Sequence, residues 1–402
     1  MNEVPGAWRR TAAGAGLLDA TGAAVPTIFA EMSALAQSTG AINLGQGFPD
    51  EDGPAEVLEA ARAAIAGGVN QYPPGRGDPD LLAAIAEHQE RFYGLTPDPQ
   101  REILVTAGAT EALAATLLAL IDSPDDEVVV FEPYYDSYAA CVALAGARLV
   151  TVPLRWPDFQ PDIDRLRDAV TDRTRLILVN DPHNPTGAVL TSQVRAEIVR
   201  LADRHDTLIV TDEVYEHLVF DRAHLPIATL PGAAARTLTI SSGGKTFATT
   251  GWKVGWISGP ESLVQAVLAV KQFLTYSGGA PFQPAIAAGL RLPDAYFTGI
   301  AATMRAKAAL LGAGLRDAGF AVSSPSGSYF TVADAAPVGA MDAAEFCRSL
   351  PERAGVVAIP LTAFVTPAHR SDYATLVRFA ACKRTDVIAE AARRLGAAGP
   401  RL

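Results

Sequence analysis

The stretch Arg175-Leu176-Ile177-Leu178-Val179-Asn180 best indicates the fold of this 402-residue chain. Four consecutive apolar residues are typical of a strand that is buried on both faces of a sheet. Comparable apolar runs lie on both sides of it, and helical stretches such as 110–120 and 192–205 separate them. This alternation predicts an α/β fold in which helices cover a mainly parallel, seven-stranded sheet. The predicted strands are 102–106, 127–131, 148–152, 175–180, 207–211, 237–241 and 255–258.

The remainder of the chain is predicted to form a second, smaller unit. After a helical stretch at 261–276, the run Ser277-Gly278-Gly279 marks a break. Beyond it, helices mix with strands at 327–332, 356–359 and 377–381, as in an α+β domain. We therefore predict an N-terminal arm (1–50) that joins the small domain, a large domain (51–288) and a small C-terminal domain (289–402).

Composition and charge narrow the classes of function. Hydrophobic residues make up 49% and charged residues 19% of the chain, as in a globular protein with a large core. A formal charge of −11 argues against sequence-independent nucleic-acid binding, which requires a basic surface. The three cysteines are far apart, the histidines show no metal-ligand spacing, and no apolar run is long enough for a membrane span. We expect a cytoplasmic protein without a metal.

Lys245 carries the strongest chemical signal, and two interpretations of it compete. It follows a predicted strand in the Gly-rich turn Ser242-Gly243-Gly244-Lys245-Thr246. A P-loop lysine would need a glycine at position 239, where this chain has Thr239, and a helix directly after the lysine. The residues after Lys245 are rich in β-branched types and are interrupted by Gly251, which disfavours that helix. The other interpretation is an amine that forms a Schiff base with an aldehyde cofactor.

Polar residues follow several of the predicted strands. Ala109-Thr110, Tyr134-Tyr135, Asn184, Asp212 and Lys245 all stand beyond strand ends. In open α/β sheets ligands bind outside the carboxyl ends of the strands, so these residues mark the expected active site.

Four segments together resemble the class I and II aminotransferases, which are pyridoxal-phosphate enzymes. They are Asn-Asp-Pro-His-Asn-Pro-Thr-Gly (180–187), Thr-Asp-Glu-Val-Tyr (211–215), Ser-Gly-Gly-Lys (242–245) and Val-Arg-Phe (377–379). The resemblance extends over about residues 25–385 and points to the kynurenine/glutamine aminotransferase branch. Within it, Asn-Leu-Gly-Gln-Gly-Phe-Pro-Asp (43–50) and Asp-Glu-Val-Tyr-Glu-His-Leu-Val-Phe (212–220) look most like bacterial N-succinyldiaminopimelate aminotransferases.

The resemblance implies a role for each polar residue around the cofactor ring. Lys245 would hold pyridoxal 5'-phosphate through a Schiff base and move the substrate proton. Asp212 would accept a hydrogen bond from the pyridine N–H, and Tyr215 and Asn184 would bind the phenolate oxygen. Tyr135 would stack on the ring, with Tyr134 as its rival. Tyr138 is equally compatible with packing in the core.

The resemblance also implies sites for the two anionic groups. Ala109 and Thr110, at a helix N-terminus, would bind the phosphate together with Ser242 and Lys253. Many relatives carry Arg at the last of these positions, so one bidentate clamp is replaced by a point charge.

Arg378 would bind the substrate α-carboxylate, with help from the N–H of Gly47. Tyr72 would reach the phosphate of a neighbouring subunit, which implies a homodimer with shared active sites.

The predicted function is transfer of an amino group from an L-amino acid to a 2-oxo acid. The leading substrate hypothesis is N-succinyl-LL-2,6-diaminopimelate with 2-oxoglutarate, a step of lysine biosynthesis. The alternatives are broad transamination of kynurenine, glutamine or methionine, with Phe29 and Tyr276 lining an apolar pocket, and cysteine-conjugate β-lyase activity. Phe29 is accordingly a candidate substrate contact, and Arg76 is a candidate cation for a distal carboxylate.

Overall fold

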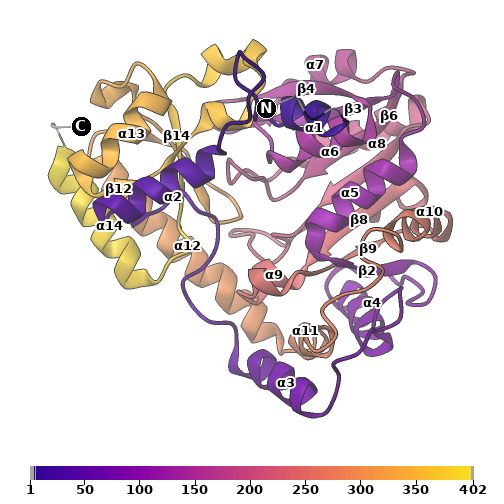
Figure 1. Cartoon of the computed structure of the whole chain (residues 1–402). Coiled ribbons are helices and arrows are strands. Elements are labelled where there is room, and N and C mark those ends of the chain that lie inside the picture. Colours follow the sequence, from indigo (N-terminus) through magenta and orange to yellow (C-terminus); the bar gives the residue numbers. More distant parts are fainter. Residues whose placement is uncertain (1–3, 5, 400–402) are drawn as a thin grey trace.

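The computed structural model describes Val4 and residues 6–399, and its centre is an eight-stranded sheet (Figure 1). The strand order is β2-β9-β8-β7-β6-β3-β4-β5. Neighbours from β8 to β4 pair in parallel, whereas β9 is antiparallel to both β2 and β8. The strands are β2 (Ile103–Ala107), β3 (Glu127–Glu132), β4 (Arg148–Arg155), β5 (Gln160–Pro161), β6 (Thr174–Asn180), β7 (Leu208–Asp212), β8 (Thr237–Ser242) and β9 (Val254–Ser258). The predicted α/β class is confirmed, and the two-residue β5 is added to the seven expected strands.

The apolar run in β6 faces two cores, as a strand buried on both faces should. Leu176 and Leu178 pack against α5 (Gly108–Leu120), α6 (Ser137–Ala145) and α10 (Glu261–Lys271). Ile177 and Val179 face the opposite way, into a core that includes residues of α7 (Ile163–Ala169) and α8 (Ser192–Arg204). This second core continues without a break into the C-terminal part of the chain.

The C-terminal part contains a four-stranded antiparallel sheet in the order β10-β11-β14-β13. Its elements are β10 (Ala321–Val322), β11 (Phe330–Asp334), β13 (Ile359–Pro360), β14 (Leu376–Ala380), α12 (Asp294–Asp317), α13 (Ala343–Ala354) and α14 (Thr385–Ala398). The N-terminal segment joins it, because β1 (Ile42–Asn43) pairs with β12 (Val356–Val357) and α2 (Ile28–Thr39) lies beside α13 (Figure 1). The domain boundaries given above stay a prediction.

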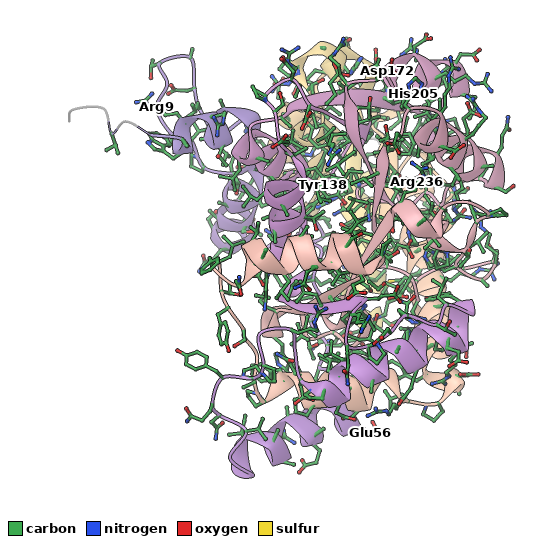
Figure 2. The ribbon with its side chains drawn as sticks, turned by 90° about the vertical axis from the view of Figure 1, so that its right-hand side faces the viewer. Arg9, Glu56, Tyr138, Asp172, His205 and Arg236 are labelled. Atoms are coloured by element: carbon green, nitrogen blue, oxygen red, sulfur yellow. The ribbon has the colours of Figure 1, made fainter. Side chains whose placement is uncertain are left out.

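The remaining helices pack mainly on other helices. Both α3 (Ala55–Ala66) and α4 (Pro79–Tyr93) pack on α11 (Phe282–Leu290), while α1 (Trp8–Gly14) packs on α6. In the side view of Figure 2, Arg9 of α1 lies at the outer edge of the molecule and Tyr138 of α6 lies inside it. The single turn α9 (Gly243–Thr246) follows β8. Short 3-10 helices lie at Ile227–Thr229, Ala234–Arg236, Thr250–Trp252, Ala336–Val338, Leu361–Phe364 and Pro367–Tyr373.

The helix expected at 261–276 is shorter than predicted. It ends at Lys271, whose buried ammonium donates to the carbonyl oxygens of Gly75 at 2.8 Å and Tyr276 at 2.5 Å. These bonds fold the following residues back over the helix end, and Tyr276 takes a left-handed backbone with φ 60°. Within the described residues, no helix is both long enough and apolar enough to span a membrane.

Strand register brings the polar residues together at one edge of the main sheet. Asn180 at the end of β6 stands opposite Asp212 at the end of β7, and Asp212 stands opposite Ile240 in β8. Behind this edge, the buried side chains of Arg195 and Asp181 form an ion pair of 2.6 Å that ties α8 to the end of β6. Because both partners are buried, removing either one would leave an uncompensated charge.

Candidate active site

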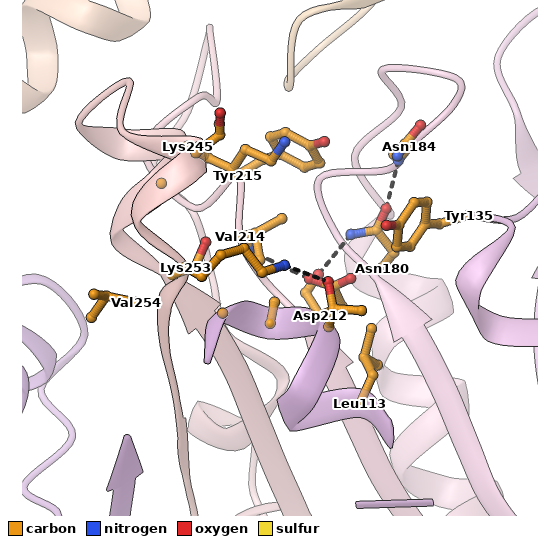
Figure 3. A pocket seen from close by; sticks show the side chains of 16 residues that line it. Leu113, Tyr135, Asn180, Asn184, Asp212, Val214, Tyr215, Lys245, Lys253 and Val254 are labelled. Atoms are coloured by element: carbon orange, nitrogen blue, oxygen red, sulfur yellow. Dashed lines mark hydrogen bonds between the residues drawn. The ribbon is translucent and has the colours of Figure 1, made fainter. Parts of the chain in front are cut away.

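A cavity opens at the carboxyl ends of β6, β7 and β8 and has a volume of about 190 Å³. A protein cavity of about 150 Å³ can hold benzene, so this cavity has room for a small organic molecule. Figure 3 shows Lys245, Asp212 and Tyr135 projecting from separate elements into the same space. The lining residues are Gly108, Ala109, Thr110, Leu113, Tyr135, Asn180, Asn184, Asp212, Val214, Tyr215, Ser242, Gly244, Lys245, Thr250, Lys253 and Val254.

Asp212 is a buried carboxylate that several neighbours hold in place. Its Oδ2 accepts a hydrogen bond of 2.6 Å from the Tyr138 hydroxyl, and its Oδ1 accepts one of 3.4 Å from the Val214 N–H. Burial raises the pKa of Asp212 from 3.8 to about 6, and the Tyr138 bond acts in the opposite direction. The carboxylate is therefore mostly ionised at neutral pH. Tyr138, left undecided by the sequence, belongs to this group because of its bond to Asp212.

The turn after β6 places Asn184 between the main sheet and Arg378. The Asn180 side chain accepts from the Asn184 N–H at 2.6 Å and donates to the Asp212 carbonyl at 2.8 Å. The Asn184 Oδ1 then accepts from Arg378 Nη1 at 3.1 Å. The neighbouring His183 is buried against Thr186, and burial lowers its pKa to about 3, so it is neutral at physiological pH.

Lys245 extends from α9 toward residues of the C-terminal part of the fold. Its Nζ donates to the Tyr329 hydroxyl at 3.0 Å and to the Gly47 carbonyl at 3.3 Å. It also lies 5.8 Å from the centre of the Tyr215 ring. Burial lowers the pKa of Lys245 from 10.5 to about 8, which leaves a usable fraction of neutral amine near pH 7. The contact with Lys245 uses the carbonyl oxygen of Gly47, and the predicted role of the Gly47 N–H toward a substrate carboxylate stays a prediction.

The N-terminus of α5 forms a cationic cradle. Gly108 begins this helix with φ +73°, and a Cβ there would lie 3.1 Å from Lys253 Cε, so a side chain would crowd the lysine. Lys253 Nζ donates to the Thr110 hydroxyl at 3.1 Å. Ala109 and Ser242 also line the cavity. Helix N–H groups and a lysine ammonium together are suited to bind a phosphate.

The structure distinguishes the two adjacent tyrosines, Tyr134 and Tyr135, by their positions. Tyr135 lines the cavity and packs edge-on against Tyr138 with ring centres 5.6 Å apart. Tyr134 is buried, and its N–H donates to the Phe364 carbonyl at 2.9 Å. The geometry therefore favours Tyr135 as the aromatic wall of the cavity.

Arg378, on β14, is buried, and one of its nitrogens has no hydrogen-bond partner. Its Nη2 donates to the Gly45 carbonyl at 2.6 Å, whereas its Nε has no hydrogen-bond partner. The guanidinium carbon lies 4.3 to 5.5 Å from the centres of three rings, those of Phe330, Phe364 and Phe29. Burial lowers the pKa of Arg378 to about 10, so it stays protonated at neutral pH. A buried unpaired donor is costly, and a carboxylate would satisfy it.

Two residues proposed from the sequence, Tyr72 and Arg76, do not line the cavity of their own chain. Tyr72 is 83% exposed and packs edge-on against Tyr276, with ring centres 6.0 Å apart. The Arg76 guanidinium donates to the Ile103 carbonyl at 2.9 Å and to the Gln265 side chain at 2.9 Å. These bonds fasten Arg76 to β2 and α10, so it is not available as a cation in the cavity of its own chain.

A second polar cluster lies in the region described by the structure, outside the cavity. The ligand atoms of His88, Glu216 and His217 lie within 4.8 Å of one another. The two histidine Nε2 atoms are 2.8 Å apart, and Glu216 accepts from the hydroxyls of Tyr93 and Ser241. Each member of the cluster therefore has a hydrogen-bond partner, and the absence of a metal stays a prediction.

The residues around the cavity suit pyridoxal phosphate. They include an ionised buried acid, a lysine of lowered pKa and an aromatic wall. A cationic helix N-terminus and an arginine with an unpaired donor complete the set. This fold and this set of residues define an aminotransferase of fold type I.

The family profile of aminotransferase class I and II matches residues 39–395. The chain therefore belongs to this family and is an aminotransferase. Family membership removes the P-loop interpretation of Lys245.

Relatives identify the branch of the family. A probable N-succinyldiaminopimelate aminotransferase, DapC, of Mycobacterium tuberculosis is 54% identical over 92% of this chain and 95% of its own length. The structure of N-succinyldiaminopimelate aminotransferase from M. tuberculosis matches with a TM-score of 0.90, covering 93% of this chain and 97% of that one. Methionine aminotransferase of Escherichia coli is 38% identical, over 92% of this chain and 95% of the relative.

The lowered pKa of Lys245 is directly measurable. Only a neutral amine reacts with an acylating reagent, so modification of the Lys245 peptide in cofactor-free protein should rise with pH and reach half its maximal rate near pH 8. Asp212→Asn should move this midpoint to lower pH, because the Asp212 charge raises the pKa of Lys245. Mass spectrometry after brief labelling gives the midpoint. A midpoint near pH 10.5 in the wild type would contradict the burial argument.

Proposed function

We propose that the protein is a pyridoxal-phosphate-dependent aminotransferase whose reaction occurs in the cavity at the carboxyl ends of β6–β8. The observation that carries the proposal is the convergence of Lys245, Asp212 and the α5 N-terminus on one cavity. When bound, the cofactor supplies an aldehyde that condenses with amines and a pyridinium ring that accepts the electron pair released at the substrate Cα.

The cofactor-binding residues act by charge and position. Asp212 would keep a proton on the pyridine nitrogen, because an ionised carboxylate within hydrogen-bond distance stabilises the N–H. Tyr215 and Asn184 would bind the ring oxygen, and Tyr135 would cover one face of the ring. The phosphate would be held by the group of residues at the α5 cradle, which are Ala109, Thr110, Ser242 and Lys253.

The substrate-binding residues orient the bond that is broken. Arg378 would bind the α-carboxylate, since its guanidinium is buried and its Nε has no partner within the protein. Fixing the carboxylate fixes the direction of the Cα–H bond. The neutral Nζ of Lys245 would then remove the proton from Cα. Phe29, 5.5 Å from the Arg378 guanidinium, would shape the substrate side of the site.

The visible spectrum tests the cofactor and the role of Lys245 together. The purified wild-type protein should absorb between about 360 and 430 nm, and L-glutamate should move this band to near 330 nm. Lys245→Ala should lose the glutamate-sensitive band of lysine-bound cofactor. Lys307→Arg, a lysine that pairs with Glu51 outside the cavity, is the matched control. A protein that stays colourless with added pyridoxal phosphate would reject the proposal.

For the substrate, we propose N-succinyl-LL-2,6-diaminopimelate with 2-oxoglutarate as acceptor. The support is the 54% identity to the M. tuberculosis relative, against 38% to the E. coli methionine aminotransferase and 36% to mouse kynurenine–oxoglutarate transaminase 3. Broad transamination of methionine, glutamine or kynurenine is the second candidate, and the same scaffold supports β-elimination from cysteine conjugates. We also infer a cytoplasmic location, in keeping with the unpaired cysteines Cys141, Cys347 and Cys382.

Competition among donors distinguishes these substrates. With equal concentrations of the succinylated substrate, methionine and kynurenine, we expect kcat/KM to favour the succinylated substrate by about 100-fold, the discrimination available from a few specific contacts. Amino acid analysis and pyruvate release report transamination and β-elimination separately. Absence of activity on the succinylated substrate, with activity on methionine, would transfer the assignment to the second candidate.

We further propose that the functional unit is a homodimer in which Tyr72 reaches the partner's phosphate cradle. The support is an exposed apolar surface formed by Val69, Tyr72, Phe273, Leu274 and Tyr276. Its two segments are joined by Lys271, which donates to the carbonyls of Gly75 and Tyr276. The Tyr72 and Tyr276 rings, 6.0 Å apart, bring the two segments together, and exposed apolar surfaces of this kind mark interaction sites.

Substitution of Phe273, which is 84% exposed, tests the dimer. Phe273→Glu should shift sedimentation toward monomer and raise the cofactor dissociation constant about tenfold, because a buried charge opposes association and Tyr72 is lost from the cradle. Tyr72→Phe should weaken the cofactor while leaving the dimer intact. Met341→Glu, at an apolar residue that is 88% exposed and outside this surface, should change neither. A wild-type protein that is monomeric and retains cofactor would contradict the proposal.

A further inference from the structure

Tyr329 is a buried tyrosine that the proposed mechanism does not yet use. Its hydroxyl accepts the hydrogen bond of 3.0 Å from Lys245 Nζ and donates a short one to the Gly47 carbonyl. The same carbonyl accepts from Lys245 at 3.3 Å, so the amine, the phenol and the carbonyl form a closed triangle. Burial raises the pKa of Tyr329 well above 10, and the phenol therefore keeps its proton and its dual role as acceptor and donor.

The local fold fixes this phenol in place. Ser328, directly before it, is fully buried with φ +55°, and its N–H donates to the Leu218 carbonyl at 2.7 Å. A Cβ at Gly47 would lie 3.1 Å from Tyr329 Cε2 and 2.8 Å from Phe330 Cζ. A left-handed turn on one side and a close glycine contact on the other leave the ring little freedom.

The triangle also joins two parts of the fold. Lys245 comes from α9, which follows the main sheet, whereas Tyr329 and Gly47 belong to segments that pack with the four-stranded sheet. The Tyr329 ring packs edge-on against Tyr215, with centres 5.1 Å apart. The contact to the amine therefore depends on the placement of one part against the other.

We propose that Tyr329 is a positioning residue that holds the ε-amine of Lys245 for proton transfer at the substrate Cα. The inference rests on the proposed function, in which Lys245 would be released from the cofactor when the amino substrate binds. The displaced amine is attached to a flexible chain of four methylene groups, and it must stay near the Cα to move a proton in each turnover. A fixed acceptor that bonds the amine restricts this motion without contacting the substrate.

Tyr329→Phe removes the hydroxyl and keeps the ring. We expect kcat to fall about tenfold, the effect of one lost hydrogen bond to a charged group, with KM for the amino donor changed less than about twofold. The isotope effect with Cα-deuterated donor should rise, because proton transfer becomes more rate-limiting. Labelling of Lys245 in cofactor-free protein should shift to lower pH, since the lost acceptor had stabilised the ammonium.

The matched control is Tyr373→Phe. Tyr373 is also buried and its hydroxyl also binds backbone, donating to the carbonyls of Glu132 and Leu154. It should leave the isotope effect and the labelling midpoint unchanged even if it lowers the melting temperature. Difluorotyrosine incorporated at position 329 keeps the hydroxyl and the ring shape but makes the phenol more acidic and a weaker acceptor, so it should fold normally and change the Lys245 labelling midpoint.

Two results would overturn the inference. One is a Tyr329→Phe protein with unchanged kcat, isotope effect and labelling midpoint. The other is a rise in KM alone, which would make Tyr329 a substrate contact. Failure of the proposed function is distinguishable, because the wild type would then lack the Lys245-dependent absorbance band. If the Tyr329→Phe protein does not fold, a folded difluorotyrosine protein with an unchanged isotope effect and an unchanged Lys245 labelling midpoint would count against the proposal.

Discussion

The structure depends on keeping an ionised carboxylate, Asp212, out of water at the end of β7. Raising its pKa from 3.8 to about 6 corresponds to about 3 kcal/mol of disfavoured ionisation. This rise is what remains after the Tyr138 hydrogen bond has offset part of the cost of burial, and Asn180 fixes the backbone carbonyl of the same residue. Tyr138 lies on α6 and Asn180 on β6. The order of the parallel strands therefore brings these partners to Asp212. A protonated pyridine nitrogen of the cofactor would compensate the rest of the buried negative charge of Asp212.

The positively charged residues of the site likewise have too few anionic partners. Lys253 and Arg378 both lower the pKa of Lys245, and the Arg378 Nε has no partner. Positive charges that converge without enough counter-charge destabilise the folded protein by themselves. A phosphate at the α5 cradle and a carboxylate at Arg378 would each relieve that repulsion. Binding energy would thus come from groups that the fold alone leaves unsatisfied, as in many functional sites.

The features predicted from the sequence are those set by local pattern. Continuous apolar runs identified the strands, and the glycine turn that follows β8 marked Lys245. Side-chain partners distant in sequence could not be predicted in this way. Tyr138 meets Asp212 across 74 positions and Tyr329 meets Lys245 across 84, and neither tyrosine differs locally from one in a core. The partners of Arg76 in its own chain, the Ile103 carbonyl of β2 and the Gln265 side chain of α10, are likewise not visible in the sequence pattern.

The N-terminal segment shows how the two sides of the site are divided. The carbonyls of Gly45, Gly47 and Phe48 accept in turn from Arg378, Lys245 and Lys383. This alignment requires close approach, since a Cβ at Gly45 would lie 2.9 Å from Ile359 Cδ1.

Groups that suit the cofactor therefore lie mostly on the main sheet, whereas groups that suit the substrate lie on the N-terminal segment and the four-stranded sheet. Changes in the second set can alter the substrate while leaving the buried acid and the phosphate cradle undisturbed. This division gives a physical reason why relatives named for different amino donors share one fold.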